Sequence, residues 1–261
     1  MKRALLVAAL FALAGCGIDH IRVLREAEQT FSRAAEQENL GRFDNQRSGA
    51  IPGGVTDTTG YRIAAEMTAK LISEKEAELK QDNLLCTAYV IRAFSLWRLG
   101  EFAKASAAAE KPCGDANATP RDRVLLGVLP ALVKIDESYA RVFNDKKQEH
   151  EEIASDIQSA IATLTQGDAK LPRDHPLRAY LFAARLAALR VAHVAPNREG
   201  LTGDREADIS DAVVKRATDM IMEYRSYLNC QLGLANHPSV AYWHSLFGIP
   251  FDPNLNINCR Q

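Results

Sequence analysis

The 261-residue chain has almost no net charge, few aromatic residues and no long hydrophobic run. Its 32 basic and 33 acidic residues leave a formal net charge of −1, and only 7% of its residues are aromatic. Nucleic-acid binding depends on a concentrated footprint of Lys and Arg, so this balance argues against a nucleic-acid partner. The apolar run at 4–14 is far shorter than the ~20 residues that a transmembrane helix needs.

Signatures of catalysis and of metal binding are also missing from the sequence. None of the five cysteines forms a C-x-x-C pair, which argues against a zinc site. No G-x-S-x-G or S-x-x-K motif occurs, and His150 has no second histidine four residues later, as a zinc peptidase would need. We therefore expect a protein that is not an enzyme and that holds no cofactor or metal.

The amino terminus has the residue pattern of an export signal. Two basic residues precede the apolar run at 4–14, and residues 13–16 read Leu-Ala-Gly-Cys. A cationic start, a short apolar run and small residues before a cleavage point are typical of a signal peptide. Residues 13–16 resemble the lipobox of bacterial lipoproteins. The resemblance implies that 1–15 are removed, that Cys16 is acylated, and that 16–20 form a lipidated tether to a membrane.

The residue after the cysteine bears on which membrane holds the anchor. Gly17 stands where lipoproteins kept at the inner membrane of enteric bacteria typically carry Asp, so the resemblance implies the outer membrane, with the protein facing the periplasm. Ala12 and Ala14 also fit an ordinary signal peptidase site, whose cleavage would release a soluble periplasmic protein. Without 1–15 the chain keeps 30 basic and 33 acidic residues, a net charge of −3.

The rest of the sequence predicts an all-α fold. Apolar residues recur three and four positions apart, and stretches with the alternating pattern of strands are few. We expect Gly41 to end the first helix, Asp82 or Asn83 to cap the third, Thr119 to cap the fifth and Pro130 to kink it. The expected helices cover 21–40, 61–79, 83–99, 102–111, 120–143, 148–165, 175–194, 206–229 and 239–247.

One pair of these helices resembles a tetratricopeptide repeat hairpin. The residues that carry the resemblance are the small Ala93, a turn at Leu99 and Gly100, Phe102 two residues later, and Ala105 where the second helix must approach the first. Small side chains at a helix crossing allow the two backbones to come close. The sequence departs from the repeat pattern at Arg92, where a leucine is usual, and at Ala109, where an aromatic residue is usual.

This resemblance implies a fold of antiparallel helical hairpins stacked as a TPR-like α-α superhelix over 21–229. Stacked arrays need their last apolar face covered, so we interpret 230–261 as a C-terminal capping segment. Because the repeats share little identity, an irregular helical bundle remains an alternative.

Four cysteines remain after Cys16, in a compartment that permits disulfides. An antiparallel hairpin would bring Cys86 and Cys113 to the same end, and Cys230 and Cys259 bracket the terminal segment. We therefore predict two local disulfides, Cys86–Cys113 and Cys230–Cys259. In the chain-entropy model each would stabilise the fold by roughly 3–4 kcal/mol.

Four aromatic residues are candidate binding residues, and packing in the core is the alternative interpretation for each: Tyr89, Trp97, Tyr242 and Trp243. The first functional hypothesis is a membrane-tethered scaffold that binds an envelope protein or peptide. The second is a small-ligand receptor or transporter-associated lipoprotein, in which the aromatic side chains line a pocket.

Overall fold

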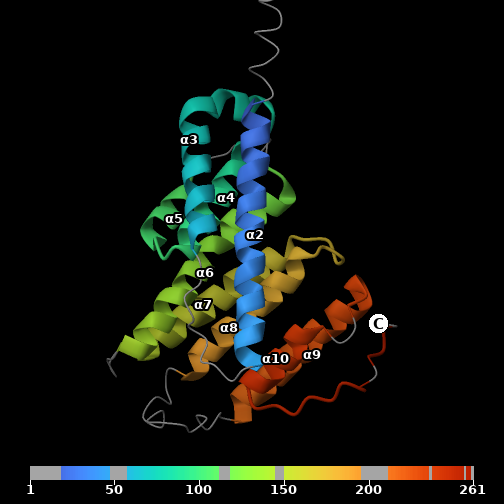
Figure 1. The fold of residues 1–261 in the computed structure, drawn as a ribbon. Helices are drawn as coiled ribbons and strands as arrows, with labels where there is room; N and C mark the ends of the chain where they lie inside the picture. Colours follow the sequence, from blue (N-terminus) through green and yellow to red (C-terminus); the bar gives the residue numbers. More distant parts are fainter. Residues whose placement is uncertain are drawn as a thin grey trace, which may run out of the picture. The chain divides into compact units, whose positions relative to one another are not determined.

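The fold is known from a computed structural model that describes residues 19–47, 58–111, 118–144, 150–194, 211–234, 237–255 and 257–259. These residues form α-helices and no β-strand, which confirms the predicted all-α class (Figure 1). In the described part of the chain there are nine helices: α2 (Asp19–Arg47), α3 (Thr59–Gln81), α4 (Leu85–Arg98), α5 (Phe102–Ala109), α6 (Pro120–Asn144), α7 (His150–Ala169), α8 (Leu177–Val194), α9 (Asp211–Leu232) and α10 (Pro238–Leu246).

Two predicted helix ends are wrong. Helix α2 continues through Gly41 to Arg47, because one glycine in a helix costs only about 1 kcal/mol and no proline follows at once. Neither Asp82 nor Asn83 caps α4, whose N-cap is Leu84 without a side-chain hydrogen bond. In contrast, Thr119 is the predicted cap of α6, because its Oγ1 accepts a hydrogen bond from the Asp122 amide at 3.0 Å.

Asn83 instead ends the preceding helix. Its φ of 60° lies in the left-handed region, which asparagine tolerates better than most residues with a side chain. The Leu84 amide donates to the Leu79 carbonyl at 2.8 Å and the Asn83 amide donates to the Lys80 carbonyl at 3.2 Å. This pair of bonds is the Schellman motif, and it satisfies carbonyls that the end of α3 would leave unpaired.

The chain divides into two compact units, Met1–Leu129 and Pro130–Gln261. Helix α6 contributes residues to both, and it remains helical through Pro130. We call the described residues of these ranges the first unit and the second unit.

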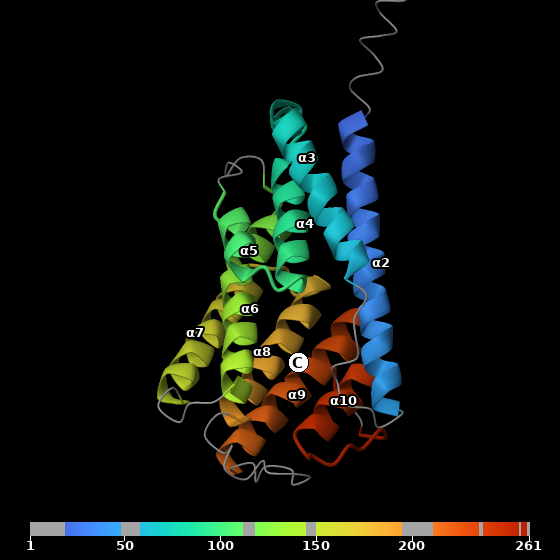
Figure 2. The same cartoon turned by 60° about the vertical axis from the view of Figure 1, so that its left-hand side comes forward.

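In the first unit, consecutive helices from α2 to α5 pack against one another, and α2 also contacts α4. Figure 2 shows α3 and α4 lying side by side. Lys75 has non-helical backbone angles, φ −134° and ψ 27°, and the last turns of α3 bend away there (Figure 1). The core is formed by buried aliphatic side chains of α2, α3 and α4: Leu24, Ala27, Ala64, Leu71, Ile72, Leu79, Leu85, Ala88 and Ile91.

The second unit has the same sequential order, with α7 on α8, α8 on α9 and α9 on α10. Helix α7 contributes the buried residues Ile153, Ile157 and Leu164. A buried cluster rich in aromatic residues lies on α8, α9 and the α10 region: Phe182, Leu186, Leu189, Ala217, Ile221, Tyr224, Tyr227, Leu228, Val240, Trp243 and Phe247.

Candidate functional site

Two candidate binding residues lie on α4 in the first unit. Tyr89 is partly buried against the core, and this burial raises the pKa of its phenol. Trp97 is also partly buried: its ring lies 5.7 Å from that of Phe94, edge to face, and the Arg98 guanidinium lies 4.9 Å from its ring centre. The Trp97 indole N–H is buried without a hydrogen-bond partner. The indole nitrogen of Trp97 is thus buried, while the residue is partly exposed and lies next to the positive charge of Arg98.

The turn that follows Trp97 forms an open depression on the first unit. Its lining is a single stretch of chain, Gly100, Glu101, Phe102, Ala103 and Lys104. Phe102 is partly exposed there, whereas Ala105 one turn later is fully buried. A surface made by consecutive residues of one turn suits contact with a protein or peptide better than enclosure of a small ligand.

The other two candidate residues lie together on α10 in the second unit. The rings of Tyr242 and Trp243 are 4.8 Å apart, edge to face. Trp243 is only 7% exposed and belongs to the core, and Tyr242 packs against the same cluster. A hydrogen bond of 2.9 Å between the Tyr224 hydroxyl and Ser239 Oγ joins α10 to α9. These contacts favour the capping interpretation of the α10 region.

One predicted disulfide is confirmed. Cys230, in the last turn of α9, is bonded to Cys259, 29 residues later. Cys86 is buried and disulfide-bonded. Cys113 lies outside the described residues, so the pairing of Cys86 with Cys113 stays a prediction.

The candidate lipidation site, Cys16, also lies outside the described residues. None of the helices in the described part of the chain has an apolar stretch long enough to cross a bilayer. Among the described residues, no group of three or more His, Cys, Asp or Glu side chains is placed to hold a metal ion.

A buried ionic cluster, which the sequence reasoning missed, joins α7 to α8. Asp168 Oδ1 accepts from Arg178 Nε at 2.7 Å, and Oδ2 accepts from Arg178 Nη2 at 3.1 Å and from Arg185 Nη2 at 3.3 Å. The hydrogen bond with Asp168 raises the pKa of Arg178, whereas burial lowers the pKa of Arg185. The only signal in the sequence is an arginine between the apolar residues Phe182 and Leu186, and its guanidinium lies 4.2 Å from the Phe182 ring centre.

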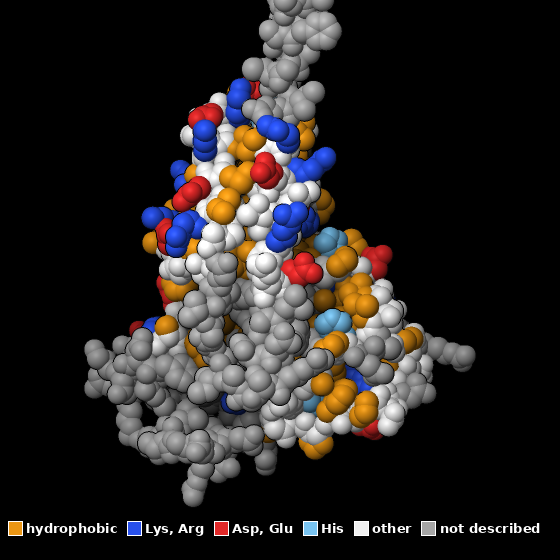
Figure 3. Space-filling view, in the orientation of Figure 1, with side chains coloured by type: hydrophobic (Ala, Val, Ile, Leu, Met, Phe, Trp, Pro, Cys, Tyr) orange, Lys and Arg blue, Asp and Glu red, His pale blue; other side chains and the backbone are white. Residues whose placement is uncertain are grey.

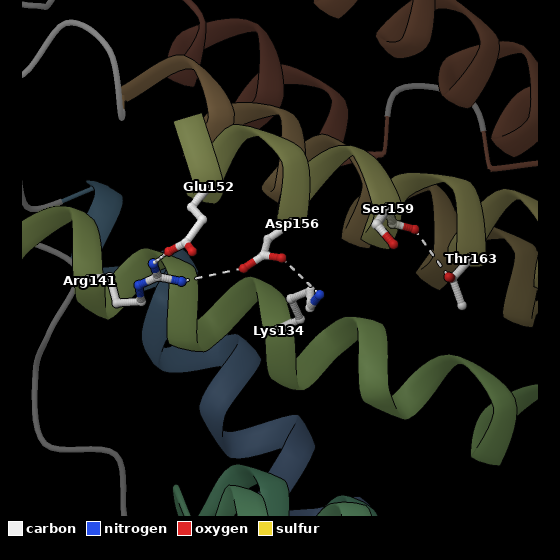
Figure 4. Close-up of polar contacts among 6 residues, drawn as sticks. All are labelled: Lys134, Arg141, Glu152, Asp156, Ser159 and Thr163. Atoms are coloured by element: carbon white, nitrogen blue, oxygen red, sulfur yellow. Dashed lines mark hydrogen bonds and ion pairs between the residues drawn. The ribbon is translucent and has the colours of Figure 1, made fainter. Parts of the chain in front are cut away.

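A second polar cluster joins α6 to α7 within the second unit. Asp156 accepts from Lys134 Nζ at 2.9 Å and from Arg141 Nη1 at 3.3 Å, and Arg141 Nη2 donates to Glu152 at 2.9 Å (Figure 4). These side chains are partly to largely exposed, the most buried being Asp156 at 30%. Exposed ion pairs contribute little to stability. The cluster therefore links α6 to α7 and contributes little to stability.

Arg225 on α9 holds the residues after α10. It is 5% exposed. Its Nη1 donates to the Asp252 carbonyl at 2.9 Å, and its Nη2 donates to the carbonyls of Pro253 and Leu255, both at 3.3 Å. The guanidinium also lies 5.4 Å from the ring centre of Phe251. Sequence reasoning could not find this contact, because all three acceptors are backbone oxygens and leave no pattern of side chains.

His244 on α10 is buried beside the same residues. It is 5% exposed, and its ring centre lies 5.2 Å from that of Phe251. Burial lowers the pKa of the imidazole and outweighs the backbone hydrogen bonds at Ile249 and Pro250, which raise the pKa; the positive charge of Arg225 adds a smaller lowering. The neutral form of His244 is therefore the form that this fold accommodates.

No protein-family model matches the chain, and no curated protein or solved structure is detectably similar to it.

Proposed function

We propose that this protein is a lipid-anchored scaffold of the bacterial cell envelope that binds a protein or peptide partner. The observation that carries the proposal is the hairpin of α4 and α5. Ala93 and Ala105, the two small residues at the expected crossing, are both fully buried, and Gly100 turns the chain between the helices with a φ of 75°. This is the arrangement that a tetratricopeptide-type hairpin requires, and we extend it to a TPR-like stack of the sequentially packed helices.

The lipobox at 13–16 supports the anchor. Helix α2 begins at Asp19, and the three peptide units from Cys16 to Asp19 span at most ~10 Å. Acyl chains on Cys16 would therefore hold the first turn of α2 close to the bilayer. His20 in that turn is hydrogen-bonded to Asp82 at 2.7 Å, so the turn between α3 and α4 would face the membrane too. The residue Gly17 supports the periplasmic face of the outer membrane as the location.

For the partner, we propose the turn between α4 and α5. Trp97, the Arg98 guanidinium over its ring and the open depression at 100–104 lie together along this stretch of chain. On the face shown in Figure 3, Lys and Arg side chains alternate with Asp and Glu side chains over the first unit, which suits a protein partner better than a polyanion. We favour the scaffold over the small-ligand receptor because Trp243 lies in the core.

The anchor is tested by mass spectrometry of the native amino terminus and by membrane fractionation. We expect the wild-type chain to begin at an acylated Cys16 and to sediment with outer membranes. The Cys16→Ala variant should appear in the soluble fraction. An uncut, unmodified amino terminus in the native cell would contradict the anchor.

The partner surface is tested by placing a photo-crosslinking amino acid at Lys104 and, as a matched control, at Lys215. Both side chains are largely exposed, at 72% and 82%. We expect an adduct of one discrete mass from position 104 and none of that mass from position 215. Trp97→Ala should abolish the adduct, whereas Trp97→Phe should keep part of it. Equal adducts at both positions, or none, would contradict a binding surface at this turn.

A further inference from the structure

The residues after α10 form a segment without helix or strand that packs on the second unit. We call the described residues of 249–259 the C-terminal strap. Most of its side chains are exposed, including those of Asp252 and Leu255, and Ile249 and Phe251 are the residues that pack against the core cluster. The strap is therefore not held by a buried core of its own.

Two attachments to α9 are prominent among the described contacts of the strap. One is covalent, the disulfide between Cys230 and Cys259. The other is the set of three hydrogen bonds from the buried Arg225 to the carbonyls of Asp252, Pro253 and Leu255. The hydrogen bonds are reversible at equilibrium, so the disulfide is the only attachment among the described residues that needs a chemical reaction to open.

Aromatic side chains lie beneath the strap. Phe251 packs against His244, and with Ile249 it adjoins the cluster that contains Trp243 and Phe247. On the face shown in Figure 3, hydrophobic side chains gather over α9 and α10. Detachment of the strap would remove Ile249 and Phe251 from this cluster and uncover part of its apolar surface.

We propose that the C-terminal strap is a redox-released cover: a dithiol reductant opens the Cys230–Cys259 disulfide, and the freed strap then exposes the apolar face of α10. This proposal is independent of the acylation of Cys16. Cys259 is an exposed residue and Cys230 is partly buried, so we place the attack at Cys259.

The reaction is ordinary thiol–disulfide exchange. One thiolate of the reductant attacks the Cys259 sulfur and forms a mixed disulfide, and Cys230 leaves as a thiolate that takes up a proton. The second thiol of the reductant loses its proton and attacks the reductant's first sulfur, which is bonded to Cys259 in the mixed disulfide. Cys259 leaves as a thiolate and is protonated in turn. Two electrons pass from the dithiol to the protein, and the reductant leaves as its own disulfide.

The size of the effect follows from the loop that the disulfide closes. The disulfide joins residues 29 apart, and the chain entropy that it removes corresponds to a change of about four-hundredfold in an opening equilibrium. Part of this restraint acts on detachment of the strap. We therefore expect hydrogen exchange at 249–259 to become at least about tenfold faster once the disulfide is gone. Exchange through local openings in α8 and in α9 before Cys230 should change little, and only their slowest amides, which exchange when the whole second unit unfolds, should follow the loss of global stability.

The experiment uses hydrogen-exchange mass spectrometry on the full mature chain. It compares the oxidised wild type with the double variant Cys230→Ser/Cys259→Ser, because a reductant would also open the disulfide of Cys86. Binding of an apolar fluorescent dye reports the uncovered surface and should increase in the double variant. The matched control is Arg225→Gln with the disulfide intact, in which local exchange at 252–255 should rise while dye binding stays at the wild-type level.

Two results would overturn the proposal. Unchanged protection of 249–259 in the double variant would show that the noncovalent contacts alone hold the strap. A loss of protection in α9 and α10 as large as the loss in the strap would show that the disulfide supports the whole second unit and that no separate cover exists.

Discussion

Single residues at tight or buried positions set much of the stability of this protein. Gly60 shows this most directly, because a Cβ atom built on it would lie 2.8 Å from the Ala34 Cβ and 3.4 Å from the Thr30 carbonyl oxygen. The absence of a side chain at Gly60 is what lets α3 approach α2. Gly127 is also helical, yet a Cβ atom there would meet no other atom within 4 Å.

We predict that Gly60→Ala destabilises the first unit by about 1–3 kcal/mol, because the two helices must separate to relieve the overlap. The matched control Gly127→Ala should be neutral or stabilise by about 1 kcal/mol, since alanine favours the helix. Urea unfolding followed by circular dichroism measures both changes. Equal effects of the two substitutions would show that helix propensity, and not close packing, governs position 60.

His244 gives the second unit a dependence on pH. Its pKa in the folded protein is lowered by burial and by Arg225, whereas in the unfolded chain it lies near 6.5. The unfolded state therefore binds more protons as the pH falls below about 6.5, and folding stability is lost in that direction. Above this pH both states are neutral at His244, and its contribution to stability is constant.

We predict that the unfolding midpoint of the second unit falls between about pH 6.5 and pH 5, and that His244→Gln reduces this slope. Trp243 fluorescence during urea unfolding reports the transition. A slope that His244→Gln leaves unchanged would assign the pH dependence to other groups.

At the scale of the helices, the sequence predicts which segments are helical better than where they end. Apolar periodicity predicts every helix from α2 to α10, because a repeat of three and four is a property of a whole segment, but α2 ends at Arg47 and not near residue 40. The ends depend on local backbone geometry. Asn83 reads equally well as a helix start or a helix end, and only the left-handed φ that it adopts between Leu79 and Leu84 decides that it ends α3.

The contacts between helices are likewise only partly predictable from the sequence. The Cys230–Cys259 disulfide is predictable, because cysteines are few and their pairing depends on where helices end. The Asp168 cluster is not predictable. Its two arginines follow Asp168 by 10 and 17 residues, on the next helix, and nothing in the sequence marks the three residues as neighbours. A buried carboxylate that accepts from two guanidinium groups is nevertheless a charge-assisted link between α7 and α8.

We predict that Asp168→Asn destabilises the second unit by about 3–5 kcal/mol, because it leaves Arg185 buried without an opposite charge. Asp219→Asn is the matched control: its carboxylate is 72% exposed and lies 3.8 Å from Lys215, so its loss should cause no measurable change. Thermal unfolding at pH 7 compares the two variants. Asp168→Asn with wild-type stability would mean that solvent or Glu223 compensates both arginines.

At the scale of the whole chain, the candidate binding residues divide between the two units. Tyr89 and Trp97 belong to the first unit, and Tyr242 and Trp243 to the second. Apolar periodicity in the sequence could not separate a surface aromatic residue from a core one, because both kinds of residue fit the same repeat. Burial separates them: Trp243 is a core residue, whereas Trp97 keeps a partly exposed ring.

Because the chain has two tryptophans, one in each unit, single-tryptophan variants can report each unit by itself. Each unit has a hydrophobic cluster of its own. Helix α6 runs through the boundary between them at Pro130, where the missing amide hydrogen removes one hydrogen bond of the helix. We therefore predict two separable unfolding transitions, reported by Trp97 in Trp243→Phe and by Trp243 in Trp97→Phe.

The Cys230–Cys259 disulfide tests this separation, because it lies wholly within the second unit. Adding Cys230→Ser/Cys259→Ser should lower the urea midpoint that Trp243 reports by about 1 M or more, since the loop entropy of the unfolded chain is restored. The midpoint that Trp97 reports should stay constant within error, because no residue of the first unit is cross-linked by this disulfide. Midpoints that fall together in both backgrounds would mean that α6 transmits unfolding through Pro130 and that the two units unfold as one.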